Sequence, residues 1–153
     1  MRRCFLFVLF TAACCVCFFP SFAGAEQRGD IILDAEQVIY DQDSGMAESE
    51  GKSSLQQDNV RIFSHRMEYD TVNQHAVATS RPGEVVTLLY GGNRFTGKTL
   101  EYDMEAGEGI LTDATGDLPA GTRGGTVYIR GKNLEVVPLN SALEKKWITK
   151  RHT

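Results

Sequence analysis

Cysteine is absent from this chain after residue 17. The four cysteines all lie in the amino-terminal stretch, at Cys4, Cys14, Cys15 and Cys17. If that stretch is removed, the remaining protein has no disulfide, no thiolate nucleophile and no cysteine ligand for a metal. Residues 26–153 must then be held together by their own hydrophobic core, and their number suits one domain.

Histidine is also scarce, with three residues in the chain. His65 and His75 are ten positions apart, and neither a nucleophile motif nor a set of metal ligands surrounds them. Asp41, Asp70 and Asp103 each precede a polar turn, where an aspartate side chain bonds to the turn backbone. We therefore expect no catalytic residue, no metal site and no cofactor, and we expect that the protein is not an enzyme.

Basic residues are few in the body of the chain. Without Arg2 and Arg3 the chain carries 14 basic and 20 acidic residues, a net charge of −6. Residues 138–153 alone carry +3, which leaves −9 on residues 26–137. Phosphate backbones select basic surfaces, so this charge argues against nucleic acid as a partner. The basic tail is explained by an ordinary solvated chain end.

Long hydrophobic runs are missing except at the amino terminus. Residues 5–19 are apolar, they follow Arg2 and Arg3, and Pro20 ends the run. The run is shorter than the ~20 residues of a spanning helix. The small residues at 23 and 25 fit a signal-peptidase site, so the pattern predicts a cleaved signal peptide over 1–25. An uncleaved anchor is the alternative.

An internal repeat is the most informative feature that is present. The dipeptide Tyr-Asp occurs three times, and a fourth segment fits the same frame with valine in the tyrosine place. The segments are 31–40, 60–69, 93–102 and 127–136, anchored on Tyr40, Tyr69, Tyr102 and Val136.

Three positions recur within each segment. Apolar residues stand seven before the anchor, at Leu33, Ile62, Phe95 and Ile129, and two before it, at Val38, Met67, Leu100 and Leu134. Small residues stand five before it, at Ala35, Ser64, Gly97 and Gly131. The apolar columns are an odd number of residues apart, so a flat strand would place them on opposite faces. A bulge or bend at the small residue would bring both to one face.

These patterns predict an all-β protein built from stacked strand–turn–strand units of about thirty residues. Turns are expected after each Tyr-Asp, at residues 81–84 and at Gly91-Gly92, which suits a two-residue hairpin. A loop is expected over 113–125, where glycine is frequent. No convincing helical period is present. The terminal units of such a stack leave open strand edges.

The segments 32–41, 67–70 and 97–103 resemble the repeat of the OstA-like domain family, which includes LptA, LptC and the amino-terminal part of LptD. The resemblance covers residues 31–137, although residues 51–59 are more polar than the family pattern. It implies a bent, open β-jellyroll whose apolar interior holds the acyl chains of lipid A. It also implies head-to-tail stacking of domains through terminal strands.

The resemblance leads to the following expectations. Residues 26–137 form an OstA-like domain, followed by the basic tail 138–153. The protein is periplasmic and carries lipopolysaccharide between the inner and outer membranes, with other OstA-like proteins or its own copies as stacking partners. The eight residues of the two apolar columns are the candidate lipid contacts. The alternative is a secreted structural β-solenoid, a scaffold or adhesin, in which the same residues form a closed, dry core.

Overall fold

The computed structural model describes residues 28–119 and 124–138. The predicted signal peptide and residues 139–153 of the basic tail lie outside the described residues. The described part is all-β, with ten strands and no helix. The first five strands are β1 (Ile32–Asp34), β2 (Gln37–Asp41), β3 (Met46–Gln57), β4 (Val60–Asp70) and β5 (His75–Thr79). The others are β6 (Val86–Tyr90), β7 (Asn93–Gly97), β8 (Thr99–Asp103), β9 (Glu108–Pro119) and β10 (Thr126–Val136).

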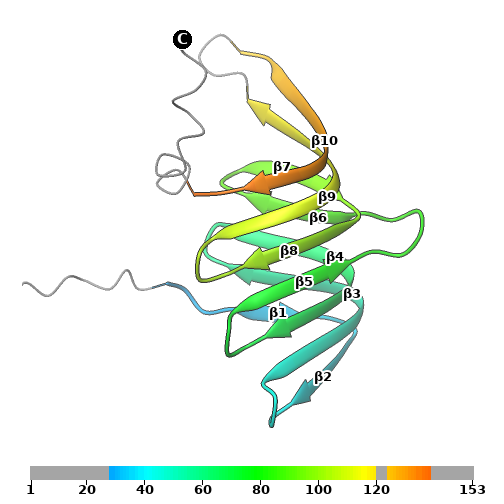
Figure 1. Ribbon diagram of the computed structural model, residues 1–153, viewed down its shortest axis with the longest axis vertical. Coiled ribbons are helices and arrows are strands. Elements are labelled where there is room, and N and C mark those ends of the chain that lie inside the picture. Colours follow the sequence, from blue (N-terminus) through cyan, green and yellow to red (C-terminus); the bar gives the residue numbers. More distant parts are fainter. Residues whose placement is uncertain (1–27, 120–123, 139–153) are drawn as a thin grey trace, which may run out of the picture.

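The strands form one antiparallel sheet that folds over along a line of bends (Figure 1). Strands β3, β4, β9 and β10 cross this line and belong to both halves. The first half-sheet has the order β2-β3-β4-β5-β8-β9-β10. The second half-sheet has the order β1-β3-β4-β6-β7-β9-β10. On the side opposite the bends, no described strand pair joins the two halves, so the jellyroll is open there. The predicted fold class is confirmed.

The bends lie at the small-residue column, as the repeat predicts. Ala35 follows the end of β1, Ser64 precedes the point where β4 changes partner, and Gly97 is the last residue of β7 before the bend into β8. In β10, the regular pairing with β9 is interrupted directly after Gly131. One residue on each strand, Lys132 and Asp113, is left out of the pairing. The corresponding irregularity in β3 is a bulge between Glu50 and Ser53. At Gly97 a small residue is needed because the neighbouring backbone approaches closely: a Cβ there would lie 2.6 Å from the carbonyl oxygen of Thr112.

The predicted turns are also confirmed. Asp41 Oδ1 accepts a hydrogen bond from the backbone N–H of Asp43, and Asp70 Oδ1 accepts from Val72 and Asn73. These bonds hold the pKa of Asp70 below its usual value, with the backbone N–H of Asn73 as the largest cause. Asp103 accepts from the N–H of Ala106 in the same way. The aspartates that follow each tyrosine are therefore turn-forming residues.

The loop expected over residues 113–125 is wrong for residues 113–119, which continue β9. Asp113 has a positive φ of 46° and stands at the bend of this strand. Beyond it, Ala114, Gly116 and Leu118 alternate as the inward-facing residues. The Phe95 ring lies on Gly116, where a Cβ would be 2.5 Å from the ring. Glycine in this segment makes room for an aromatic ring and does not mark a loop.

The polar segment 51–59 is mostly strand, because its inward polar groups are paired. Within β3 the inward positions include three buried polar residues, Ser49, Ser53 and Gln57. Ser49 Oγ donates to the carbonyl of Met67, and Gln57 Nε2 donates to the carbonyl of Gly29. A buried polar side chain with a partner costs little, so this strand tolerates a low apolar content.

Candidate functional site

The structure brings the two predicted columns to the same interior, from opposite half-sheets. The column seven before the anchor lies on the second half-sheet, and the column two before it lies on the first. Their four central members are buried in one core cluster: Ile62, Met67, Phe95 and Leu100. The other four lie toward the ends of the stack, where Leu33, Ile129 and Leu134 are half-buried and Val38 is 44% exposed.

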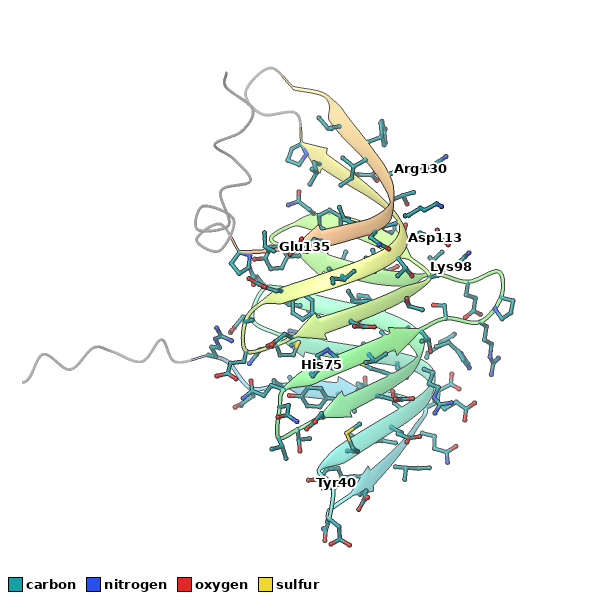
Figure 2. The ribbon with its side chains drawn as sticks, viewed as in Figure 1. Tyr40, His75, Lys98, Asp113, Arg130 and Glu135 are labelled. Atoms are coloured by element: carbon teal, nitrogen blue, oxygen red, sulfur yellow. The ribbon has the colours of Figure 1, made fainter. Side chains whose placement is uncertain are left out.

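The interior face continues to both edge strands and is uncovered there. In β2, Val38 and Tyr40 pair with the inward residues Ser49 and Ala47, yet Tyr40 is 53% exposed. In β10, Val127 pairs with the inward residue Leu118 and is 45% exposed. Figure 2 shows Tyr40 and Arg130 near opposite ends of the stack. Among the described strands, β2 pairs only with β3 and β10 only with β9, so each end presents an open backbone edge.

A hollow of about 430 Å³ lies on the open side, here called the mouth pocket. Its walls come from turns of both half-sheets and from residues next to them. They are Arg28, Gln57, Asp58, Asn59, Val60, Tyr90, Tyr102, Met104, Ala106, Gly107 and Pro138. Val60 and Met104 are buried and form an apolar floor, while Arg28 and Asp58 are the only charged side chains among its described residues.

The amino-terminal segment 28–31 crosses this open side and ties the half-sheets together. Arg28 Nη1 donates to the carbonyl of Met104, beside the β8–β9 turn, at 2.7 Å. The N–H of Gly29 donates to Asp58 Oδ1, in the β3–β4 turn, at 3.0 Å. Met104 comes directly after a strand of the first half-sheet, and Asp58 lies in a turn of the second half-sheet. The two hydrogen bonds therefore connect the half-sheets across the open side.

Tyr102 lines the mouth pocket and carries a buried hydroxyl group. Its side chain is 1% exposed, and its ring lies against Gly109, the residue that pairs with it on β9. Its hydroxyl group is buried without a hydrogen-bond partner. Burial raises the pKa of Tyr102 far above its usual value, the nearby Tyr90 adds to this rise, and Arg28 opposes it. The phenol is therefore protonated at neutral pH and can donate a hydrogen bond.

The line of bends carries a separate, polar hollow of about 410 Å³. Its charged residues are Glu36, Glu50, Lys52, Arg81 and Glu84. Nearby, Lys98 Nζ and Asp113 Oδ2 form an ion pair of 2.6 Å on the outside of the bend (Figure 2). The mixed charge and the absence of an apolar floor distinguish this hollow from the mouth pocket.

Sequence reasoning missed the mouth pocket. Tyr102 marks the repeat frame, but its sequence context carries no sign of a hydroxyl without a partner. Arg28 lies outside every repeat, and only the folded chain brings it to Met104. Over residues 28–119 and 124–138, no three His, Cys, Asp or Glu side chains are grouped to hold a metal. None of the described segments is a helix that could span a membrane.

No protein-family model matches the sequence, and no curated protein is significantly similar to it. Among solved structures, the chain is similar to LptH of Pseudomonas aeruginosa, described as the LptA-homologous periplasmic component of a lipopolysaccharide transport device. The TM-score is 0.50 at 13% sequence identity, over 71% of this chain and 76% of that one. The fold is LptA-like. At this identity the likeness shows the fold alone, so it supports the OstA-like resemblance only at that level.

Proposed function

We propose that this chain is a non-catalytic, periplasmic lipid-binding protein that carries lipopolysaccharide as part of a bridge between membranes. The observation that carries the proposal is the apolar interior, which runs uncovered to both edge strands at Val38, Tyr40 and Val127. A self-contained domain gains stability by covering such residues. A domain that passes acyl chains to a stacked neighbour needs them open.

In this proposal the acyl chains lie between the half-sheets, against the two inner columns. They enter where the columns are uncovered, near Leu33 and Val38 at one end and near Ile129 and Leu134 at the other. Each buried methylene contributes ~0.8 kcal/mol, so a short apolar path is enough to hold a lipid with several chains. The central residues of the two columns pack against one another in this structure. An acyl chain can therefore lie between them only if the half-sheets move apart.

Those same central residues favour the second candidate, a structural β-solenoid with a dry core. Ile62, Met67 and Leu100 have no exposed surface, as expected for an ordinary closed core. The two candidates differ in what the purified protein contains. A carrier retains lipid through purification, whereas a scaffold does not.

The test is to express the chain in a host with an outer membrane, purify the secreted form and analyse its organic extract by mass spectrometry. We expect the wild-type extract to contain lipopolysaccharide, recognised by its lipid A part. The Ile129→Asp extract should contain less of it, because a carboxylate is not readily desolvated against hydrocarbon. Ile110→Asp is the matched control, since Ile110 is half-exposed on the outer face of β9. A wild type with no more lipid than an unrelated periplasmic protein purified in parallel would establish the scaffold instead.

A further inference from the structure

The hydroxyl of Tyr102 identifies the mouth pocket as a place where a ligand atom fits. A buried hydroxyl without a hydrogen-bond partner destabilises a protein, and such groups are uncommon in native structures. The Tyr102 ring is held against Gly109, so the hydroxyl is not readily turned away to find a partner elsewhere. Tyr102 is one of the residues that line a hollow large enough for part of a ligand.

The residues around Tyr102 determine which kind of ligand atom fits beside its hydroxyl. Arg28 and Tyr90 line the same hollow and interact electrostatically with the Tyr102 hydroxyl. A guanidinium group has five N–H donors, of which one donates to the carbonyl of Met104. The guanidinium has no acceptor atom and both phenols are able to donate, so a ligand oxygen that accepts hydrogen bonds matches these three groups.

The charge and the apolar floor of the pocket limit the chemical class of the ligand further. Arg28 and Asp58 balance one another, and Asp30 and Glu105 line the adjoining hollow, so the described residues of the two hollows carry a net negative charge. A phosphate with two negative charges is disfavoured there. Below the rim, Val60 and Met104 form an apolar floor. An acceptor oxygen followed directly by hydrocarbon fits both features.

We propose that the mouth pocket is the subsite for the carbonyl end of an acyl chain. The carbonyl oxygen accepts hydrogen bonds from the Tyr102 hydroxyl and the Arg28 guanidinium, and the first methylenes lie over Val60 and Met104. This inference rests on the proposed lipid-binding function and adds to it a defined polar contact. The acyl carbonyl comes either from a free fatty acid or from an ester or amide of a larger lipid.

The test is a fluorescence titration of delipidated protein with cis-parinaric acid and, separately, with its methyl ester. We expect Tyr102→Phe to weaken binding of both probes about 5- to 10-fold, the usual value of one hydrogen bond. Its midpoint of unfolding in urea should equal or exceed that of the wild type, because the substitution removes a hydroxyl that has no partner. Tyr128→Phe is the control, since Tyr128 is exposed on the outer face of β10, and it should change neither quantity.

Arg28→Gln distinguishes the two sources of the carbonyl. A loss of affinity for the acid alone assigns the pocket to free carboxylates, and an equal loss for both probes assigns it to ester or amide carbonyls. Unchanged binding by Tyr102→Phe would overturn the subsite, and so would a lower urea midpoint, which shows that the hydroxyl has a structural partner. If the purified wild type carries lipid but binds neither probe, the subsite is overturned and the carrier function stands. If the purified wild type carries no lipid and binds neither probe, both the subsite and the carrier function are overturned.

Discussion

At the scale of single residues, the small positions of the repeat differ in how closely the chain approaches them. A Cβ on Gly97 would lie 2.6 Å from the carbonyl oxygen of Thr112 and 2.7 Å from the Leu111 side chain. A Cβ on Gly131 would meet nothing closer than the carbonyl oxygen of Asn133, at 3.2 Å. The same sequence position is therefore a tight contact in the middle of the stack and a looser one at its end.

Gly97→Ala should lower the free energy of unfolding by about 1–3 kcal/mol, because the new methyl group collides with backbone that cannot rotate away. Gly131→Ala is the matched substitution and should cost less than ~1 kcal/mol. Urea denaturation followed by circular dichroism measures both. Equal losses in the two variants would contradict the explanation by close approach.

At the scale of strands, residues of one column have different roles because their strands have different neighbours. Leu100 in β8 lies between β5 and β9, has no exposed surface and belongs to the core. Val38 in β2 holds the same place in its repeat, yet β2 is paired on one side only and Val38 stays open. Burial follows the position of the strand in the stack.

Leu100→Asp should therefore destabilise the domain by at least about 4 kcal/mol, since a carboxylate would be buried without a partner. Val38→Asp makes a similar change in the same column and should stay within about 1 kcal/mol of the wild type, because the new carboxylate remains hydrated. Thermal unfolding followed by circular dichroism compares them. A Leu100→Asp protein as stable as Val38→Asp would show that the centre of the stack is open to solvent.

At the scale of the whole molecule, charge separates between the outer faces. A cross-strand row on the first half-sheet contains Glu48, Glu68, Glu101 and Glu135. Arg66 bridges the first two of these carboxylates, at 3.4 Å and 3.2 Å. The outer face of the second half-sheet carries Arg61, Arg94 and Arg130, with Asp117 opposite Arg94. At the two ends the inward-facing Val38, Tyr40 and Val127 are exposed, so end-to-end contact between copies would bury apolar surface.

Val38→Asp should accordingly weaken assembly while leaving the fold intact. In sedimentation velocity at increasing protein concentration, we expect the wild type to associate through its end strands and this variant to remain largely monomeric. The reason is that a charge on an exposed edge strand opposes strand pairing. Ile110→Asp places the same charge on the outer face of β9, which is paired on both sides, and should associate like the wild type. A wild type that stays monomeric at high concentration and crosslinks to no OstA-like protein would contradict end-to-end stacking.

The sequence by itself determined the strands, the bends and the inward columns, because these follow from local chemistry. An odd spacing between Ile62 and Met67 requires a bend, a small residue such as Ser64 permits it, and an aspartate after each tyrosine forms the turn. These signals lie within about ten residues of one another. The repeat then reproduces them along the chain, so the fold class could be predicted without coordinates.

Only the tertiary structure decided which inward residues are closed and where polar groups meet. The sequence around Gly116 predicts a loop, but in the fold Phe95 from another strand covers this glycine. Arg28 and Met104 are 76 residues apart, and only the folding of the sheet brings them into contact across the mouth. The hydroxyl of Tyr102 lacks a partner for the same reason. Burial and long-range contact depend on the whole stack, and no local pattern encodes them.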